Sequence, residues 1–164
     1  MAYTAYTSPD ISKLLNDGTR KFMDGLWNYS EIDPELGFYQ PLWDAEHSAE
    51  WTGNTLGMAV QIDYGSPTWI ERAMKTGQLM RDVWTDYDTK RLRRFRANYF
   101  GAATVGLLRG HQYDSWINYR AIRPAAAVLW YNQNQAIAEL MIEHADAWLD
   151  AAMSTERGKP WGVI

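Results

Sequence analysis

The residue types best suited to chemistry gather in one stretch, RLRRFRANYFGAATVGLLRGHQYDSWINYRAIRP, which runs from Arg91 to Pro124. It holds seven arginines and one of the three histidines, together with several Tyr, Asn and Trp residues. Its glycines and weak helical periodicity are typical of the irregular segments on which a rigid fold places binding and catalytic residues.

A second group of polar side chains follows Asp44, in the sequence HSAEWTGNTLGM. His47, Glu50, Trp51, Asn54 and Met58 stand at offsets of 0, 3, 4, 7 and 11, so a helix places them on one face. Small and aliphatic residues fall on the opposite face. We therefore expect a helix whose aliphatic face packs against the core and whose polar face lines a cavity. The alternative is a solvated face with a weak histidine–glutamate pair.

These side chains suit an acidic sugar. Arginine binds a carboxylate through two hydrogen bonds, Asn or His polarises that carboxylate, and Tyr or His serves as base and acid. The candidates for acid–base chemistry are His47, Tyr99, His111 and Tyr119. The candidates for substrate binding are Asn54, Arg94, Asn98, Asn118, Arg120 and Arg123, with Trp43, Trp51 and Trp116 as stacking platforms. If the reaction is hydrolysis, the carboxylates to consider are Asp44, Glu46 and Glu50.

Structural interpretations of the same residues stay open. The segment from Arg91 to Arg96 is also compatible with a solvated basic turn that pairs with Asp82, Asp86 and Asp88. The Tyr119–Arg123 segment is also compatible with a structural tie between helix ends. Core packing explains many of the nine tryptophans, because bulky aromatic side chains are mostly buried.

Several classes of protein and site are excluded or disfavoured. The chain has no cysteine and lacks the GxGxxG, GxxxxGK[ST], GxSxG and HExxH patterns, so we expect no cofactor and no metal. A net charge of -4 argues against a nucleic-acid partner. No apolar run is long enough for a membrane span, and no signal peptide is visible. A cytoplasmic protein and a processed secreted protein both fit.

The elements that must position these residues are helices. Apolar periodicity predicts an all-α fold in a single domain, residues 1–164, built from antiparallel helical hairpins. We expect helices over residues 10–28, 44–63, 67–84 and 134–153, with a further helix that begins at Pro124. Residues 29–43 and 85–117 should be long irregular segments. We see no strand alternation.

Two segments carry a resemblance to a known group of enzymes, LWDAEHSAEWTGN and the chain from YDSWINYRAIRP to GKPWGVI. They resemble parts of the α/α-toroid carbohydrate-active enzymes, which are polysaccharide lyases and glycoside hydrolases built from rings of helical hairpins. The resemblance implies a carbohydrate ligand, and β-elimination or hydrolysis in a cleft lined by Trp, Tyr, His, Asn and Arg. The alternative is a non-catalytic helical module for sugar binding or assembly.

A complete toroid has more helices than we expect here, so the resemblance implies one section of a ring, a reduced relative, or a unit that completes its cleft by association. Either a homo-oligomer or the remainder of a larger toroid chain would complete the cleft. The chain stops on two apolar residues without a polar tail, which favours a sequence that continues in its parent.

Overall fold

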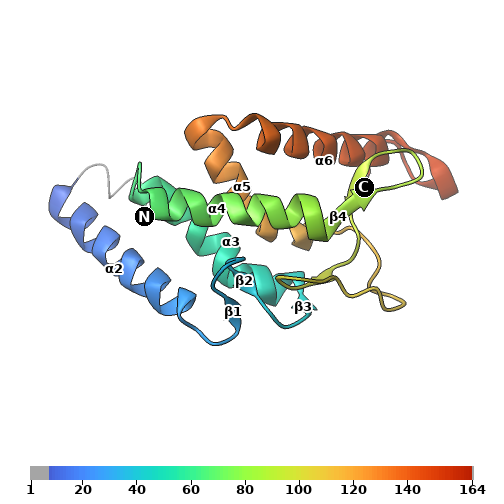
Figure 1. The fold of residues 1–164 in the computed structure, drawn as a ribbon. Helices are drawn as coiled ribbons and strands as arrows, with labels where there is room; N and C mark the ends of the chain where they lie inside the picture. Colours follow the sequence, from blue (N-terminus) through green and yellow to red (C-terminus); the bar gives the residue numbers. More distant parts are fainter. Residues whose placement is uncertain (1–7, 164) are drawn as a thin grey trace.

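The computed structural model describes residues 8–163, except for the side chain of Trp51. Figure 1 shows a mostly helical protein, and the described part contains five α-helices. They are α2 (Pro9–Trp27), α3 (Ala45–Ile62), α4 (Pro67–Leu79), α5 (Tyr119–Asn132) and α6 (Gln135–Met153). The predicted predominance of helix is confirmed. Four of the five predicted helices lie where the apolar periodicity places them.

Local sequence explains where these helices begin. The Asp44 carboxylate accepts a hydrogen bond from the His47 N–H at 2.9 Å, which caps α3. The Asn134 side chain caps α6 in the same way, through the Ile137 N–H at 3.1 Å. Such caps satisfy N–H groups that have no partner inside the helix. Pro67 occupies the first turn of α4, where a missing N–H costs nothing.

Two glycines of α3 lie close against α5. A Cβ atom added at Gly53 would lie 2.0 Å from the Arg120 carbonyl oxygen. One turn further along α3, a Cβ atom at Gly57 would lie 3.4 Å from the Arg123 carbonyl oxygen. Glycine at these two positions lets the two backbones approach each other, as in other small-residue helix contacts. The rest of the core combines aliphatic side chains with a cluster of aromatic rings, in which Trp84 packs on Phe38 and Phe100.

The expectation that the segments outside the helices lack strands is wrong. Three two-stranded antiparallel sheets occur in the described residues, and each is too short to produce an alternating pattern. They pair β1 (Ile32–Asp33) with β2 (Phe38–Tyr39), β3 (Trp43–Asp44) with β6 (Tyr99–Phe100), and β4 (Thr85–Tyr87) with β5 (Arg93–Phe95). The β3–β6 pair joins the start of α3 to the arginine-rich stretch, with Asp44 opposite Tyr99.

The prediction that a helix begins at Pro124 is also wrong. The helix α5 begins at Tyr119, after a 3₁₀ turn η2 (Trp116–Asn118), and Pro124 is buried inside it. Proline lacks the N–H that would bond to the carbonyl four residues earlier, at Arg120. That carbonyl is the one that meets Gly53, so the tertiary contact accommodates the proline. The helix predicted over residues 67–84 is α-helical as far as Leu79, and its last five residues form a π-helical turn, η1 (Met80–Trp84).

Candidate functional site

A groove of about 450 Å³ lies between α3 and α5. The α3 side supplies residues of the face predicted to line a cavity, among them Asn54 and Met58, and the α5 side supplies Arg123. The complete lining is Gly53, Asn54, Gly57, Met58, Gln61, Arg123, Ala126, Ala127 and Trp130. We call this the α3–α5 groove. Its floor is made of glycine and alanine because the two helices approach closely there, and its polar side chains stand at the edges.

Arg123 carries the charge of this groove. Its Nη1 atom donates a hydrogen bond to the Asn54 Oδ1 atom, which holds the guanidinium against α3. Both residues were predicted to bind substrate, and the structure brings them together across 69 positions of sequence. Within the described residues, no carboxylate lies within ion-pair distance of Arg123, in contrast to Arg120. The groove therefore keeps a positive charge whose hydrogen-bond partner, among the described residues, is a neutral amide.

Arg120 lies one turn earlier on α5 and has a different environment. Its guanidinium pairs with the Glu46 carboxylate at 3.3 Å and with the Glu50 carboxylate at 3.9 Å. Two carboxylates offset its charge, so Arg120 ties α5 to the first turns of α3. This arrangement resembles the predicted tie between helix ends more than a free anion site.

Trp130 also lines the groove and was not among the binding residues predicted from the sequence. Its side chain is 56% exposed and packs edge-to-face on Tyr64, with ring centroids 5.9 Å apart. An exposed indole held by a second aromatic ring offers a flat apolar surface to a ligand. No local signal in the sequence identified it, because its exposure depends on where α3 stops covering α5.

The first turn of α3 holds a histidine–carboxylate pair. The His47 Nδ1 atom lies 2.9 and 2.8 Å from the two carboxylate oxygens of Asp44. The Trp43 ring stacks on the imidazole, with centroids 5.5 Å apart. A carboxylate at Nδ1 favours the tautomer whose proton is on Nδ1, which leaves Nε2 as a base. His47 and Trp43 are both exposed, so this base is accessible.

Three more predicted residues gather close to this pair. Tyr99, which lies opposite Asp44 in the β3–β6 sheet, contacts His111, and the two ring centroids are 4.3 Å apart. The buried Asn98 side chain donates to the Tyr113 hydroxyl at 2.8 Å. The β3–β6 pairing therefore places Asn98, Tyr99 and His111 next to the start of α3, where His47 lies.

Other predicted residues lie elsewhere. Arg94 pairs with Asp88 at 2.8 Å and with Asp150 of α6 at 3.7 Å, so it follows the alternative of a basic turn paired with acidic residues. Asn118 is fully buried, and Trp116 is 69% exposed. Tyr119 packs on Trp148 of α6. The side chain of Trp51 lies outside the part of the chain that the structure describes.

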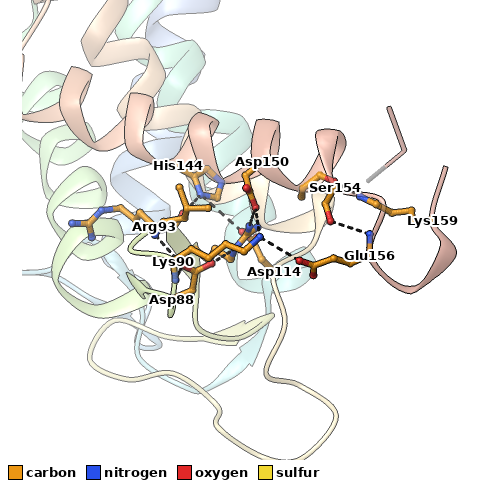
Figure 2. Close-up of polar contacts among 12 residues, drawn as sticks. Asp88, Lys90, Arg93, Asp114, His144, Asp150, Ser154, Glu156 and Lys159 are labelled. Carbon is orange, nitrogen blue, oxygen red and sulfur yellow. Dashed lines mark hydrogen bonds and ion pairs between the residues drawn. The ribbon is translucent and has the colours of Figure 1, made fainter. Parts of the chain in front are cut away.

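A buried pair that sequence reasoning missed lies beside Tyr119. Figure 2 shows Asp114 close to His144, which belongs to α6. The Asp114 carboxylate lies 3.9 Å from the His144 Nδ1 atom. The imidazole lies 3.2 Å from the Arg93 carbonyl oxygen through Nδ1, and its Nε2 atom accepts from the Trp148 indole at 3.2 Å. Burial raises the pKa of the Asp114 carboxyl and lowers the pKa of the His144 imidazole. Only a neutral imidazole makes both hydrogen bonds, so this histidine connects structural elements.

The Arg93 side chain completes this connection. Its guanidinium, 10% exposed, donates to the Glu143 carboxylate at 2.6 Å and to the Tyr87 hydroxyl at 3.0 Å. Lys90, in the turn between β4 and β5, pairs with Asp150 at 3.2 Å (Figure 2). The arginine-rich turn is thus fastened to α6.

The described residues include no group of three or more His, Asp or Glu side chains placed to hold a metal ion. None of their helices has the length and apolar character that crossing a membrane requires. No protein-family model, no curated protein and no solved structure matches this chain.

Proposed function

We propose that this protein is carbohydrate-active and that its α3–α5 groove binds a polysaccharide that carries carboxylates. The observation that carries the proposal is the Arg123 guanidinium, which stands at the edge of an open groove with a neutral amide as its partner. A uronate carboxylate would supply the missing negative charge and accept two parallel hydrogen bonds. The exposed Trp130 ring would stack on a sugar face.

The polysaccharide would run along α3 from this groove toward His47. Asn54 and His47 are seven residues apart, which is about 10 Å along a helix axis. One sugar would therefore lie at Arg123 while a neighbouring sugar reaches the accessible His47 Nε2 atom. In this arrangement His47 is the base, and Tyr99 and His111 are the groups available as acid. Because Arg120 engages Glu46 and Glu50, β-elimination is favoured over hydrolysis.

The fold proposal accompanies the functional one. The pairs α3–α4 and α5–α6 are each joined by a short connection, as in the hairpins of an α/α toroid. We propose that these hairpins are one section of such a ring. A second copy of the chain, or further helices of a larger chain, would then close the cleft around the polysaccharide.

A second candidate function is a sugar-binding module without catalysis. It is favoured by the separation between the groove charge at Arg123 and the base at His47, which places them at different sugars. The two functions differ in a single outcome, because both require binding and only the enzyme forms a product.

The test combines binding with product detection. Polygalacturonate, alginate and hyaluronate would be compared with the neutral polymer dextran by calorimetry, and unsaturated uronate products would be followed by ultraviolet absorbance. We expect Arg123→Gln to weaken acidic binding by about tenfold or more, since hydrogen bonds to charged groups contribute roughly 1.5–3 kcal/mol. The matched control is Arg109→Gln, an exposed arginine in the loop between β6 and η2, which should bind as the wild type does.

Each result assigns a function. Binding that Arg123→Gln weakens, with product that His47→Gln abolishes, supports the lyase. Binding without product supports the module. Absence of binding to every polysaccharide, or equal binding by the Arg123→Gln variant, would refute the proposed site.

A further inference from the structure

A second groove of about 250 Å³ lies between α2 and α3. Most of its lining side chains are apolar. Two of these side chains are open to solvent, since Leu14 is 71% exposed and Phe22 is 50% exposed. The lining is Leu14, Leu15, Gly18, Thr19, Phe22, Thr55 and Met58. We call it the α2–α3 groove. Open apolar surface of this kind, held on two helices, is typical of a binding site.

Gly18 lies at the centre of this groove. A Cβ atom there would meet no atom within 4 Å, so the packing of the chain does not require glycine. Glycine inside a helix is less stable than alanine by about 1 kcal/mol. The missing side chain has one visible consequence, which is that the middle of the groove stays open between Leu14 and Phe22. This openness lets a ligand approach the helix backbone closely.

The two grooves share Met58 as a lining residue. This residue lines both of them, with Asn54 on the side of the α3–α5 groove and Thr55 on the side of the α2–α3 groove. At 100° per residue, Asn54, Met58 and Thr55 follow one another around α3. Methionine is flexible and accommodates irregular apolar ligands. A ligand held at Arg123 could therefore extend over Met58 into the apolar groove.

We propose that the α2–α3 groove binds an acyl or alkyl substituent of the acidic saccharide that occupies the α3–α5 groove. This inference rests on the proposed saccharide binding at Arg123. The charge of Arg123 selects the carboxylate end of the ligand. The surface of Leu14, Phe22 and Met58 then removes the apolar end from water.

Alkyl glucuronides of increasing chain length test the inference. Methyl, butyl, hexyl and octyl glucuronide would be titrated by NMR below the concentration at which the longest one forms micelles. We expect the affinity to rise about fourfold per added methylene, the factor that corresponds to ~0.8 kcal/mol per buried CH₂, until the groove is full. Methyl glucuronide should bind weakly and depend on the α3–α5 groove alone.

Two leucine substitutions on α2 give the matched comparison. Gly18→Leu fills the groove, whereas Gly25→Leu adds the same side chain where a Cβ atom also meets nothing, outside the groove. Both replace a helical glycine with a better helix former, so both variants should fold. We expect Gly18→Leu to abolish the dependence on chain length while leaving methyl glucuronide affinity unchanged. Gly25→Leu should retain the wild-type series.

The outcomes separate this inference from the proposed function. If all glucuronides bind equally, the acyl site is refuted and saccharide binding stands. If octyl glucuronide binds no better than octyl glucoside and Arg123→Gln has no effect, the groove is a general apolar surface and the inference fails. If Gly18→Leu instead abolishes self-association seen by light scattering, the groove belongs to a second copy of the chain, which also refutes it. Failure of methyl glucuronide and of every polysaccharide to bind refutes the proposed function itself.

Discussion

The contact between Gly53 of α3 and the Arg120 carbonyl of α5 gives the most direct test of the fold. In a Gly53→Ala variant the new Cβ atom would lie 2.0 Å from that oxygen and 2.8 Å from the carbonyl carbon. Both atoms belong to the backbone, so no side-chain rotation can relieve the overlap. The helices would have to separate by roughly 1.4 Å, the difference between 2.0 Å and the 3.4 Å of ordinary contact.

The size of the effect follows from two opposing terms. Overpacking a core costs about 1–3 kcal/mol, and a clash with backbone belongs at the upper end of that range. Replacing glycine by alanine inside a helix returns about 0.5–1 kcal/mol. We therefore expect a net loss of about 2 kcal/mol in the free energy of unfolding. For a chain of this size that loss lowers Tm by about 4–8 °C.

Thermal and urea unfolding of a graded glycine series would measure this. Gly57→Ala, whose Cβ atom would lie 3.4 Å from the Arg123 carbonyl, should be close to neutral. Gly25→Ala, with no atom within 4 Å, should raise the stability by about 0.5–1 kcal/mol through helix propensity alone. A Gly53→Ala protein as stable as the Gly25→Ala protein would refute the close α3–α5 contact. The geometry of the candidate groove would then be refuted with it.

Three further predictions concern the C-terminal half of the chain. Because burial lowers the pKa of the His144 imidazole, the unfolded chain takes up the proton first as the pH falls below about 6.5. The wild type should then lose up to about 1.4 kcal/mol of stability per pH unit until the native pKa is reached, a slope that His144→Gln should lack in urea titrations at several pH values. Arg93→Gln should lower the unfolding free energy by about 2 kcal/mol, because it removes the charge-assisted hydrogen bond of a buried guanidinium. Lys90→Gln, at an exposed position between β4 and β5, should change Tm little, and the reverse order would contradict the assignment. Asn134→Ala removes the cap of α6 and should cost about 1 kcal/mol by calorimetry, whereas an unchanged Tm would mean that packing alone fixes the start of that helix.

The positions of four of the five helices could be read from the sequence because the signals are local. The Asp44 and Asn134 caps and the apolar stripes depend on residues three or four positions apart. The same periodicity placed Asn54 and Met58 on one face of α3, and both line the groove. Pro124 was misleading for a related reason. Proline most often occupies the first turn of a helix. Pro124 instead lies inside α5, where the Arg120 carbonyl contacts Gly53 of α3, and the local sequence gives no sign of that contact.

The roles of the arginines could not be read from the sequence. The sequence shows Arg94, Arg120 and Arg123 as similar residues in one polar stretch. In the folded chain, Arg94 pairs with acidic groups near α6 and Arg120 pairs with two glutamates. Among the residues that the structure describes, Arg123 instead bonds to the Asn54 amide. The partner of each charged side chain depends on contacts between segments that are distant in sequence, so it cannot be predicted from neighbouring residues. The same holds for the Asp114–His144 pair, whose members are thirty positions apart.

What the sequence by itself determined is therefore the set of helices, their caps and the faces that each presents. The tertiary structure alone decided which face of α3 meets α5, and hence that one arginine of the polar stretch keeps its charge beside an open groove. The physical reason lies in the range of the interactions. Helix periodicity and capping act within one or two turns, whereas burial, ion pairing and groove formation depend on residues that only folding brings together.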